Sequence, residues 1–131
     1  MTAQQKILLV DDERDVREAL RARLTAEGYT VAAVGSGQEA IDAAAAQAFD
    51  LILLDMLMPG KGGYTTLQEI RADPAIKPIP VILLTAVAAQ GQWEVVPDQA
   101  FGQTFIMGKP LDHAVLLERI RYVLTTEPEA S

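Results

Sequence analysis

Short, uninterrupted apolar segments recur along this 131-residue chain, and polar residues follow closely after most of them. Four such segments occupy residues 7–10, 51–54, 81–84 and 105–107, and residues 29–34 form a further segment rich in β-branched side chains. Continuous apolar runs are typical of strands that are covered on both faces, whereas half-exposed strands alternate apolar and polar residues. The pattern therefore predicts a parallel sheet between two layers of helices.

Helical patterns separate these segments. They cover residues 15–27, 36–47, 64–71 and 112–124. Val16, Leu20 and Leu24 recur at helical spacing, and Gly28 follows where a C-terminal cap belongs. Ser36 and Glu39 have the spacing of a capping box, and Asp112 is an expected N-cap. Strand–helix alternation implies right-handed crossovers between parallel strands, so the fold class is α/β and doubly wound.

One segment departs from this alternation. Residues 87–104 occupy the place of a fourth crossover helix, but they contain Gly91, Pro97 and Gly102 and lack a clean apolar period. We expect a short, broken or displaced helix there. Residues 125–131 are expected to form a frayed tail after a core of about residues 5–124.

Composition restricts the function. A length of 131 residues suits one domain, and the absence of cysteine excludes disulfides, thiolate metal sites and a cysteine nucleophile. The net charge of −7 disfavours direct binding to nucleic acid or to an anionic membrane. No apolar stretch approaches the roughly 20 residues of a membrane span. We expect a soluble, cytoplasmic protein without an output domain, which acts by binding a partner.

Polar side chains follow the ends of four predicted strands. Asp11 and Asp12 follow the first, Asp55 the third, Thr85 the fourth and Lys109 the fifth. The carboxyl ends of parallel strands meet at one edge of a sheet, where such folds bind ligands. Each residue alone has an ordinary explanation as a turn or cap residue. Their joint arrangement predicts three carboxylates, a hydroxyl and an ammonium at one edge.

This set of groups suits phosphoryl transfer. Clustered carboxylates repel one another unless a cation joins them, and oxygen ligands without His or Cys favour Mg²⁺ (or Mn²⁺). A carboxylate can accept a phosphoryl group and form an aspartyl phosphate. A lysine ammonium and a metal ion both offset the charge of the transferring group. The chain has no evident second substrate site, so the expected acceptor is the protein itself.

The motifs that carry these residues resemble those of the receiver domains of bacterial response regulators. The matching sequences are ILLVDDE at 7–13, DLILLDMLMPGKGG at 50–63, VILLTA at 81–86 and GKPL at 108–111. The resemblance covers nearly the whole chain. It implies a flavodoxin-like sheet of five parallel strands in the order 2-1-3-4-5.

The resemblance also implies a role for each matching residue. Asp55 is the expected phosphoacceptor. Asp12, Asp55 and the backbone carbonyl of Leu57 are expected to bind the metal, and Asp11 is expected to join the site through a water molecule or by orienting Asp12. Thr85 is the switch hydroxyl, and Lys109 binds phosphoryl oxygen. The small Ala86 leaves room for the phosphoryl group, and Pro110 follows the lysine, in the family commonly through a cis bond.

One position departs from the family pattern. The family usually has an aromatic switch residue three positions before the lysine, where this chain has Ile106, and Phe105 lies one position earlier. Either the strand register is shifted by one residue or the aromatic switch is lost, because a one-residue slip turns every side chain to the other face. The residues alone leave both alternatives open.

The resemblance implies a signalling phosphoacceptor rather than an enzyme, although such a domain can catalyse its own phosphorylation and dephosphorylation. The implied partners are a histidine kinase, a phosphotransfer protein or a small phosphodonor, and a downstream protein; homodimerisation through the last helix is an analogy only. One alternative is a receiver-like interaction module that is not phosphorylated. Another is a hydrolase with an aspartyl-phosphate intermediate, but that class usually has a second Asp where this chain has Leu57.

Overall fold

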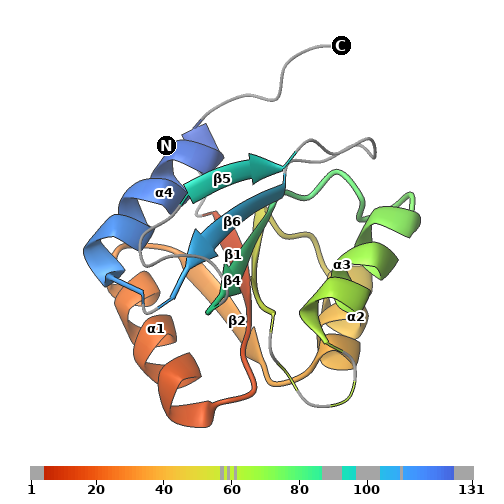
Figure 1. The fold of residues 1–131 in the computed structure, drawn as a ribbon, viewed down its shortest axis with the longest axis horizontal. Helices are drawn as coiled ribbons and strands as arrows, with labels where there is room; N and C mark the ends of the chain where they lie inside the picture. Colours follow the sequence, from red (N-terminus) through yellow and green to blue (C-terminus); the bar gives the residue numbers. More distant parts are fainter. Residues whose placement is uncertain are drawn as a thin grey trace.

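Five parallel strands form the body of a sheet in the computed structural model of this chain, which describes residues 5–56, 58, 60, 62–86, 104–109 and 111–125, and the backbone of 93–96. The strands are β1 (Lys6–Val10), β2 (Thr30–Val34), β3 (Leu51–Asp55), β4 (Val81–Thr85) and β6 (Thr104–Gly108). Their spatial order is β2-β1-β3-β4-β6 (Figure 1). The predicted doubly wound α/β fold and its strand order are therefore confirmed.

Among the described residues, two helices cover each face of the sheet, as Figure 1 illustrates. They are α1 (Arg14–Ala26) and α4 (His113–Thr125) on one face and α2 (Gly37–Ala46) and α3 (Gly63–Ala72) on the other. Alternate residues of the central strands pack into the two cores, so that Ile7 and Leu9 face α1 and α4 while Leu8 and Val10 face α2 and α3. All four of these residues are fully buried, which explains the continuous apolar runs.

The predicted caps form at two of the helices. Ser36 Oγ accepts a hydrogen bond from the backbone N–H of Glu39 at 3.1 Å, and Asp112 Oδ1 accepts one from the backbone N–H of Ala114 at 2.9 Å. Each bond satisfies a backbone donor that has no partner within its helix. On α1 the predicted apolar face is only partly correct: Leu20 and Leu24 are buried, but Val16, in the first turn, is 42 % exposed.

The expected helix within residues 87–104 is wrong where the structure describes this segment. Residues 93–96 form β5 (Trp93–Val96), which pairs antiparallel with β6 at the edge of the sheet, with Val95 opposite Phe105. Trp and Val favour extended structure, and Pro97 ends any helix before it. The sheet thus has a sixth, antiparallel strand in addition to the five that were predicted.

Two further predictions concern the C-terminal tail and the absence of a membrane-spanning segment. The last described helix, α4, ends at Thr125, and the predicted tail beyond it lies outside the described residues. Within the described ranges every helix falls short of the apolar length needed for a bilayer span.

Candidate functional site at the carboxyl edge of the sheet

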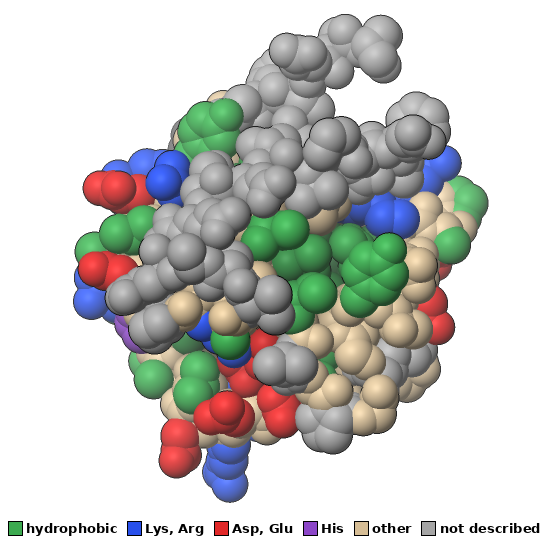
Figure 2. All heavy atoms as spheres, viewed as in Figure 1, with side chains coloured by type: hydrophobic (Ala, Val, Ile, Leu, Met, Phe, Trp, Pro, Cys, Tyr) green, Lys and Arg blue, Asp and Glu red, His purple; other side chains and the backbone are tan. Residues whose placement is uncertain are grey.

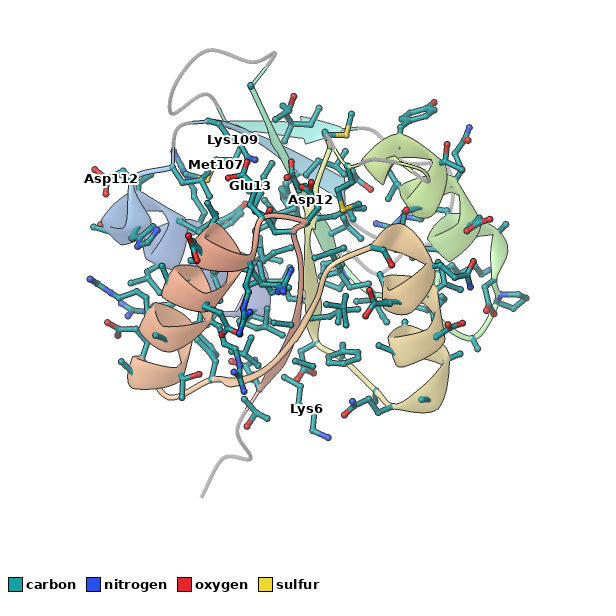
Figure 3. The ribbon with its side chains drawn as sticks, turned by 90° about the horizontal axis from the view of Figure 1, so that it is seen from below. Lys6, Asp12, Glu13, Met107, Lys109 and Asp112 are labelled. Carbon is teal, nitrogen blue, oxygen red and sulfur yellow. The ribbon has the colours of Figure 1, made fainter. Side chains whose placement is uncertain are left out.

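The predicted polar residues gather where the parallel strands end. Figure 3 shows Asp12, Glu13 and Lys109 at one end of the sheet and Lys6, the first residue of β1, at the other. Figure 2 has the same view as Figure 1, in which β4 and β6 end at their arrowheads. Acidic side chains lie close together just below that place in Figure 2. The candidate site is therefore an acidic cluster at the carboxyl edge.

Three carboxylates form this cluster. One oxygen each of Asp11, Asp12 and Asp55 lies within 4.8 Å of the others. Asp11 and Asp55 are each only 3 % exposed, whereas Asp12 is exposed at the mouth of the site. Sequence reasoning predicted all three residues, and the structure brings them together.

Asp11 is held in place within the cluster. Its backbone N–H donates to the carbonyl of Val34 at 3.2 Å, and its Oδ1 accepts from the backbone N–H of Glu13 at 2.9 Å. Burial is the main cause that raises the pKa of Asp11 above its ordinary value; Asp55 and Asp12 raise the pKa further, while the Glu13 N–H and Lys109 oppose them. The folded chain thus places a carboxylate where its negative charge is costly.

Lys109 brings a positive charge to this edge. Its Nζ lies 3.0 Å from Oδ1 of Asp55, and its side chain is 25 % exposed. Its backbone N–H donates to the carbonyl of Thr85 at 2.8 Å, one step beyond the pairing of Thr85 with Gly108. Thr85 is itself nearly buried at the end of β4, so the strand ladder fixes both residues beside the acidic cluster.

Gly63 allows the loop after β3 to close tightly. A Cβ at this position would collide with the carbonyl oxygen of Asp55 and lie 2.7 Å from Cα of Met56. The backbone N–H of Gly63 donates to the carbonyl of Met56 at 3.2 Å, and α3 begins at Gly63. The absence of a side chain therefore sets how closely α3 approaches the end of β3, which carries Asp55.

The pairing of β6 places the two candidates for the aromatic position on opposite faces of the sheet. Phe105 is 2 % exposed and packs in the core between the sheet, α1 and α4, whereas Ile106 faces the opposite core and is partly exposed. Ile106 pairs with Leu83. The side chain three residues before Lys109 therefore lies on the opposite face of the sheet from Phe105.

The other predicted site residues are placed less fully. Ala86 is exposed just after β4. Leu57 and Pro110 lie outside the described residues, so the predicted carbonyl ligand and the bond after Lys109 remain predictions. Sequence reasoning also missed a contact: Nη1 of Arg17, on α1, donates to the backbone carbonyl of Asp11 at 2.8 Å. A backbone acceptor leaves no signal in the sequence.

The donor set fits a hard divalent cation. Two oxygens on opposite sides of Mg²⁺ are about 4.2 Å apart, close to the upper limit of 4.8 Å for the three carboxylate oxygens. The cluster contains neither His nor Cys. A cation would also offset the repulsion from Asp55 and Asp12, which adds to the effect of burial in raising the pKa of Asp11. Asp11, Asp12 and Asp55 would hold such an ion.

The fold and this edge together define a doubly wound, flavodoxin-like domain with an acidic site and a lysine at the carboxyl ends of its strands. The family model of the response regulator receiver domain matches residues 7–121. The chain therefore belongs to the receiver domains of the response regulators of two-component systems.

Comparison with individual proteins agrees. Response regulator PleD of Caulobacter vibrioides is 39 % identical over 117 residues, which are 88 % of this chain but 25 % of PleD. The chain thus spans a quarter of the length of that relative. The receiver domain of sensor histidine kinase PA1611 from Pseudomonas aeruginosa, solved with a magnesium ion in its active site cleft, superposes with a TM-score of 0.79 at 33 % identity, covering 95 % of this chain and 100 % of that one. Chemotaxis protein CheY4 of Vibrio cholerae gives 0.76 at 28 % identity, covering 93 % and 100 %.

Proposed function

We propose that this chain is a phosphorylation-switched signalling domain that accepts a phosphoryl group on Asp55 with Mg²⁺ bound beside it. The observation that carries the proposal is the convergence of three carboxylates within 4.8 Å, with the Lys109 ammonium 3.0 Å from Asp55. Asp55 is the member of the cluster that is shared between the acidic group and the lysine. That position suits the acceptor, because charge on both sides can offset a transferring phosphoryl group.

In the proposed reaction a carboxylate oxygen of Asp55 attacks phosphorus, and the bond from phosphorus to the donor breaks as the new bond forms. The donor is a phosphohistidine on a histidine kinase or phosphotransfer protein, or a small phosphodonor. The metal ion, when bound, supplies Lewis-acid stabilisation of the phosphoryl oxygens. Asp11, Asp12 and Asp55 would hold it, with the carbonyl of Leu57 as a further ligand. Lys109 and the hydroxyl of Thr85 take phosphoryl oxygens, and Ala86 leaves space for them.

The consequence of phosphorylation is a change in affinity for a downstream protein. The added phosphoryl group brings about −1.5 to −2 charge units and three acceptor oxygens to a carboxylate that is only 3 % exposed. With Phe105 packed in the core and Ile106 three positions before Lys109, the switch would rely on Thr85 and Lys109 rather than on an aromatic side chain. The domain acts as a cytoplasmic signalling phosphoacceptor rather than as an enzyme with a separate substrate.

A phosphoryl-incorporation assay tests the proposal. The whole chain is incubated with Mg²⁺ and acetyl phosphate, and its intact mass is followed. We expect one phosphoryl group per chain, none after Asp55→Asn, and full incorporation by Asp42→Asn, a carboxylate-to-amide change on the exposed face of α2. Repeating the assay with Mn²⁺ compares the second hard cation. No incorporation would favour an interaction module that is not phosphorylated, and continued turnover of a phosphate ester would favour a hydrolase.

A further inference from the structure

Arg17 connects α1 to the acidic edge through a backbone carbonyl rather than through a carboxylate. Its Nη1 donates to the backbone carbonyl of Asp11 at 2.8 Å, while its own backbone N–H donates to the carbonyl of Glu13 at 2.9 Å. The guanidinium therefore closes the turn between β1 and α1 from the helix side. This turn carries both Asp11 and Asp12.

Asp11 is consequently held from three directions. β2 accepts its N–H through the carbonyl of Val34, the turn donates to its carboxylate through the N–H of Glu13, and α1 donates to its carbonyl through Arg17. Two of these bonds come from the backbone. The third depends on the identity of one side chain, so it can be removed by a single substitution.

The hydrogen bond from Arg17 to the Asp11 carbonyl opposes the electrostatic repulsion within the acidic cluster. Asp11 is 3 % exposed and lies within 4.8 Å of two other carboxylates, so like-charge repulsion favours a movement of the turn away from Asp55. A turn that yields to this repulsion separates the ligands and must be brought back when a metal ion binds. Preorganisation of ligands by outer contacts commonly accounts for about 10-fold to 100-fold in metal affinity.

Gly35, in the loop after β2, provides the space for this contact. A Cβ on Gly35 would lie 3.0 Å from Nη1 and 3.7 Å from Cζ of Arg17. Among the described glycines only Gly28 and Gly60 have a positive φ, so Gly35 is not required for its backbone conformation. Because Gly35 has no side chain, the Arg17 guanidinium fits between the loop after β2 and the β1–α1 turn.

We propose that Arg17 is a positioning residue for the divalent cation, and that Gly35 serves it by leaving room for the guanidinium. The inference rests on the proposed function, because it assumes that Asp11, Asp12 and Asp55 bind Mg²⁺. Arg17 acts on Asp11 through its carbonyl and holds the β1–α1 turn in the conformation that keeps the three carboxylates together.

The test compares the Mg²⁺ dissociation constants of whole-chain variants by isothermal titration calorimetry. Arg17→Ala is expected to weaken binding about 10-fold, and Gly35→Ala by a smaller factor, because the added methyl group displaces the guanidinium. The double variant should bind like Arg17→Ala alone, since Gly35 acts only through Arg17. Arg21→Ala removes an exposed arginine from the same helix and should leave the constant unchanged.

A second measurement separates positioning from a general loss of structure. The rate of phosphorylation by acetyl phosphate should fall in Arg17→Ala at low Mg²⁺ and return to the wild-type rate at saturating Mg²⁺. An unchanged dissociation constant in Arg17→Ala, or independent losses that multiply in the double variant, would overturn the positioning role while the proposed function stands. If Arg17→Ala does not fold, an unchanged constant in Gly35→Ala overturns it equally. A wild-type chain that binds no Mg²⁺ would overturn the proposed function, and this inference with it.

Discussion

The ammonium of Lys109 reaches across β4 to pair with Asp55 at the end of β3, with Nζ 3.0 Å from Oδ1. Asp55 is almost completely buried, whereas Lys109 keeps a quarter of its side chain exposed. The ion pair therefore stabilises the buried Asp55 carboxylate more than it stabilises the partly exposed Lys109 ammonium. A buried charge that loses its partner costs more than the pair contributes in net stability.

Replacement of this lysine should consequently destabilise the metal-free protein. Lys109→Ala is expected to lower the free energy of unfolding by about 1–3 kcal/mol in EDTA, because it removes the ammonium that lies 3.0 Å from the nearly buried Asp55 carboxylate. Urea unfolding at neutral pH measures the change. Adding Asp55→Asn to Lys109→Ala should recover part of the loss, and an additive double variant would contradict the coupling.

The raised pKa of Asp11 gives a pH-dependent prediction. Below pH 3.8, its ordinary value, the carboxyl is protonated in both the folded and the unfolded chain and has no effect on stability. As the pH rises through the higher folded pKa, ionisation penalises the folded state. Asp11→Asn retains an acceptor for the Glu13 N–H and should therefore stabilise the metal-free protein at neutral pH, with a gain that vanishes at acid pH.

The same substitution should have the opposite effect once metal is added. We expect Mg²⁺ to stabilise the wild-type chain by binding the folded state, and Asp11→Asn to remove part of that binding. Thermal unfolding with EDTA and with excess Mg²⁺ measures both effects. A variant that is less stable than the wild type in EDTA at neutral pH would show that burial of this charge is not costly.

Gly63 gives a steric prediction. Gly63→Ala places a methyl group against the carbonyl of Asp55 and 2.7 Å from Cα of Met56, so we expect a loss of about 2–3 kcal/mol in the free energy of unfolding. The control is Gly62→Ala, whose Cβ would lie 3.8 Å from the nearest atom, the carbonyl oxygen of Met56. Similar losses for the two variants in urea titrations would show that tight closure does not set the need for glycine.

Much of the fold and site follows from local sequence. The strands were predictable because both faces are buried, and the carboxylates because parallel strands share one carboxyl edge. Residues 93–96 were predicted incorrectly, since the choice between a broken helix and an edge strand depends on pairing with a distant strand. The contact of Arg17 with Asp11 was not predictable either, because a carbonyl acceptor exists at every residue.

Arg71 gives a prediction for the opposite edge of the sheet. Its Nη1 donates to the carbonyls of Lys77 and Ile79 at 2.8 and 2.7 Å, and its Nη2 donates to Oγ1 of Thr104 at 2.8 Å. Arg71→Ala should lower the free energy of unfolding by about 2–3 kcal/mol, and Arg71→Lys should recover little because an ammonium lacks the planar fork.

Urea unfolding measures the effect of the Arg71 variants, and calorimetry should find the Mg²⁺ affinity unchanged. Arg21→Ala is again the matched control, because its pair with Glu18 is half exposed on both sides and should contribute less than about 1 kcal/mol. A weakened Mg²⁺ site in Arg71→Ala would contradict the separation of the two edges.

The hydrophobic cores on the two faces of the sheet limit how far β3 and β4 can move when negative charge is added at the carboxyl edge. In β3, Leu53 and Leu54 are fully buried on opposite faces of the sheet. In β4, Ile82 and Leu84 are fully buried on one face and Val81 on the other. Sliding either strand would disturb both packed layers at once, at a cost of several kcal/mol. A signal from the proposed phosphorylation of Asp55 would therefore have to leave through the loops and side chains beyond the strand ends, while the strands themselves keep their positions.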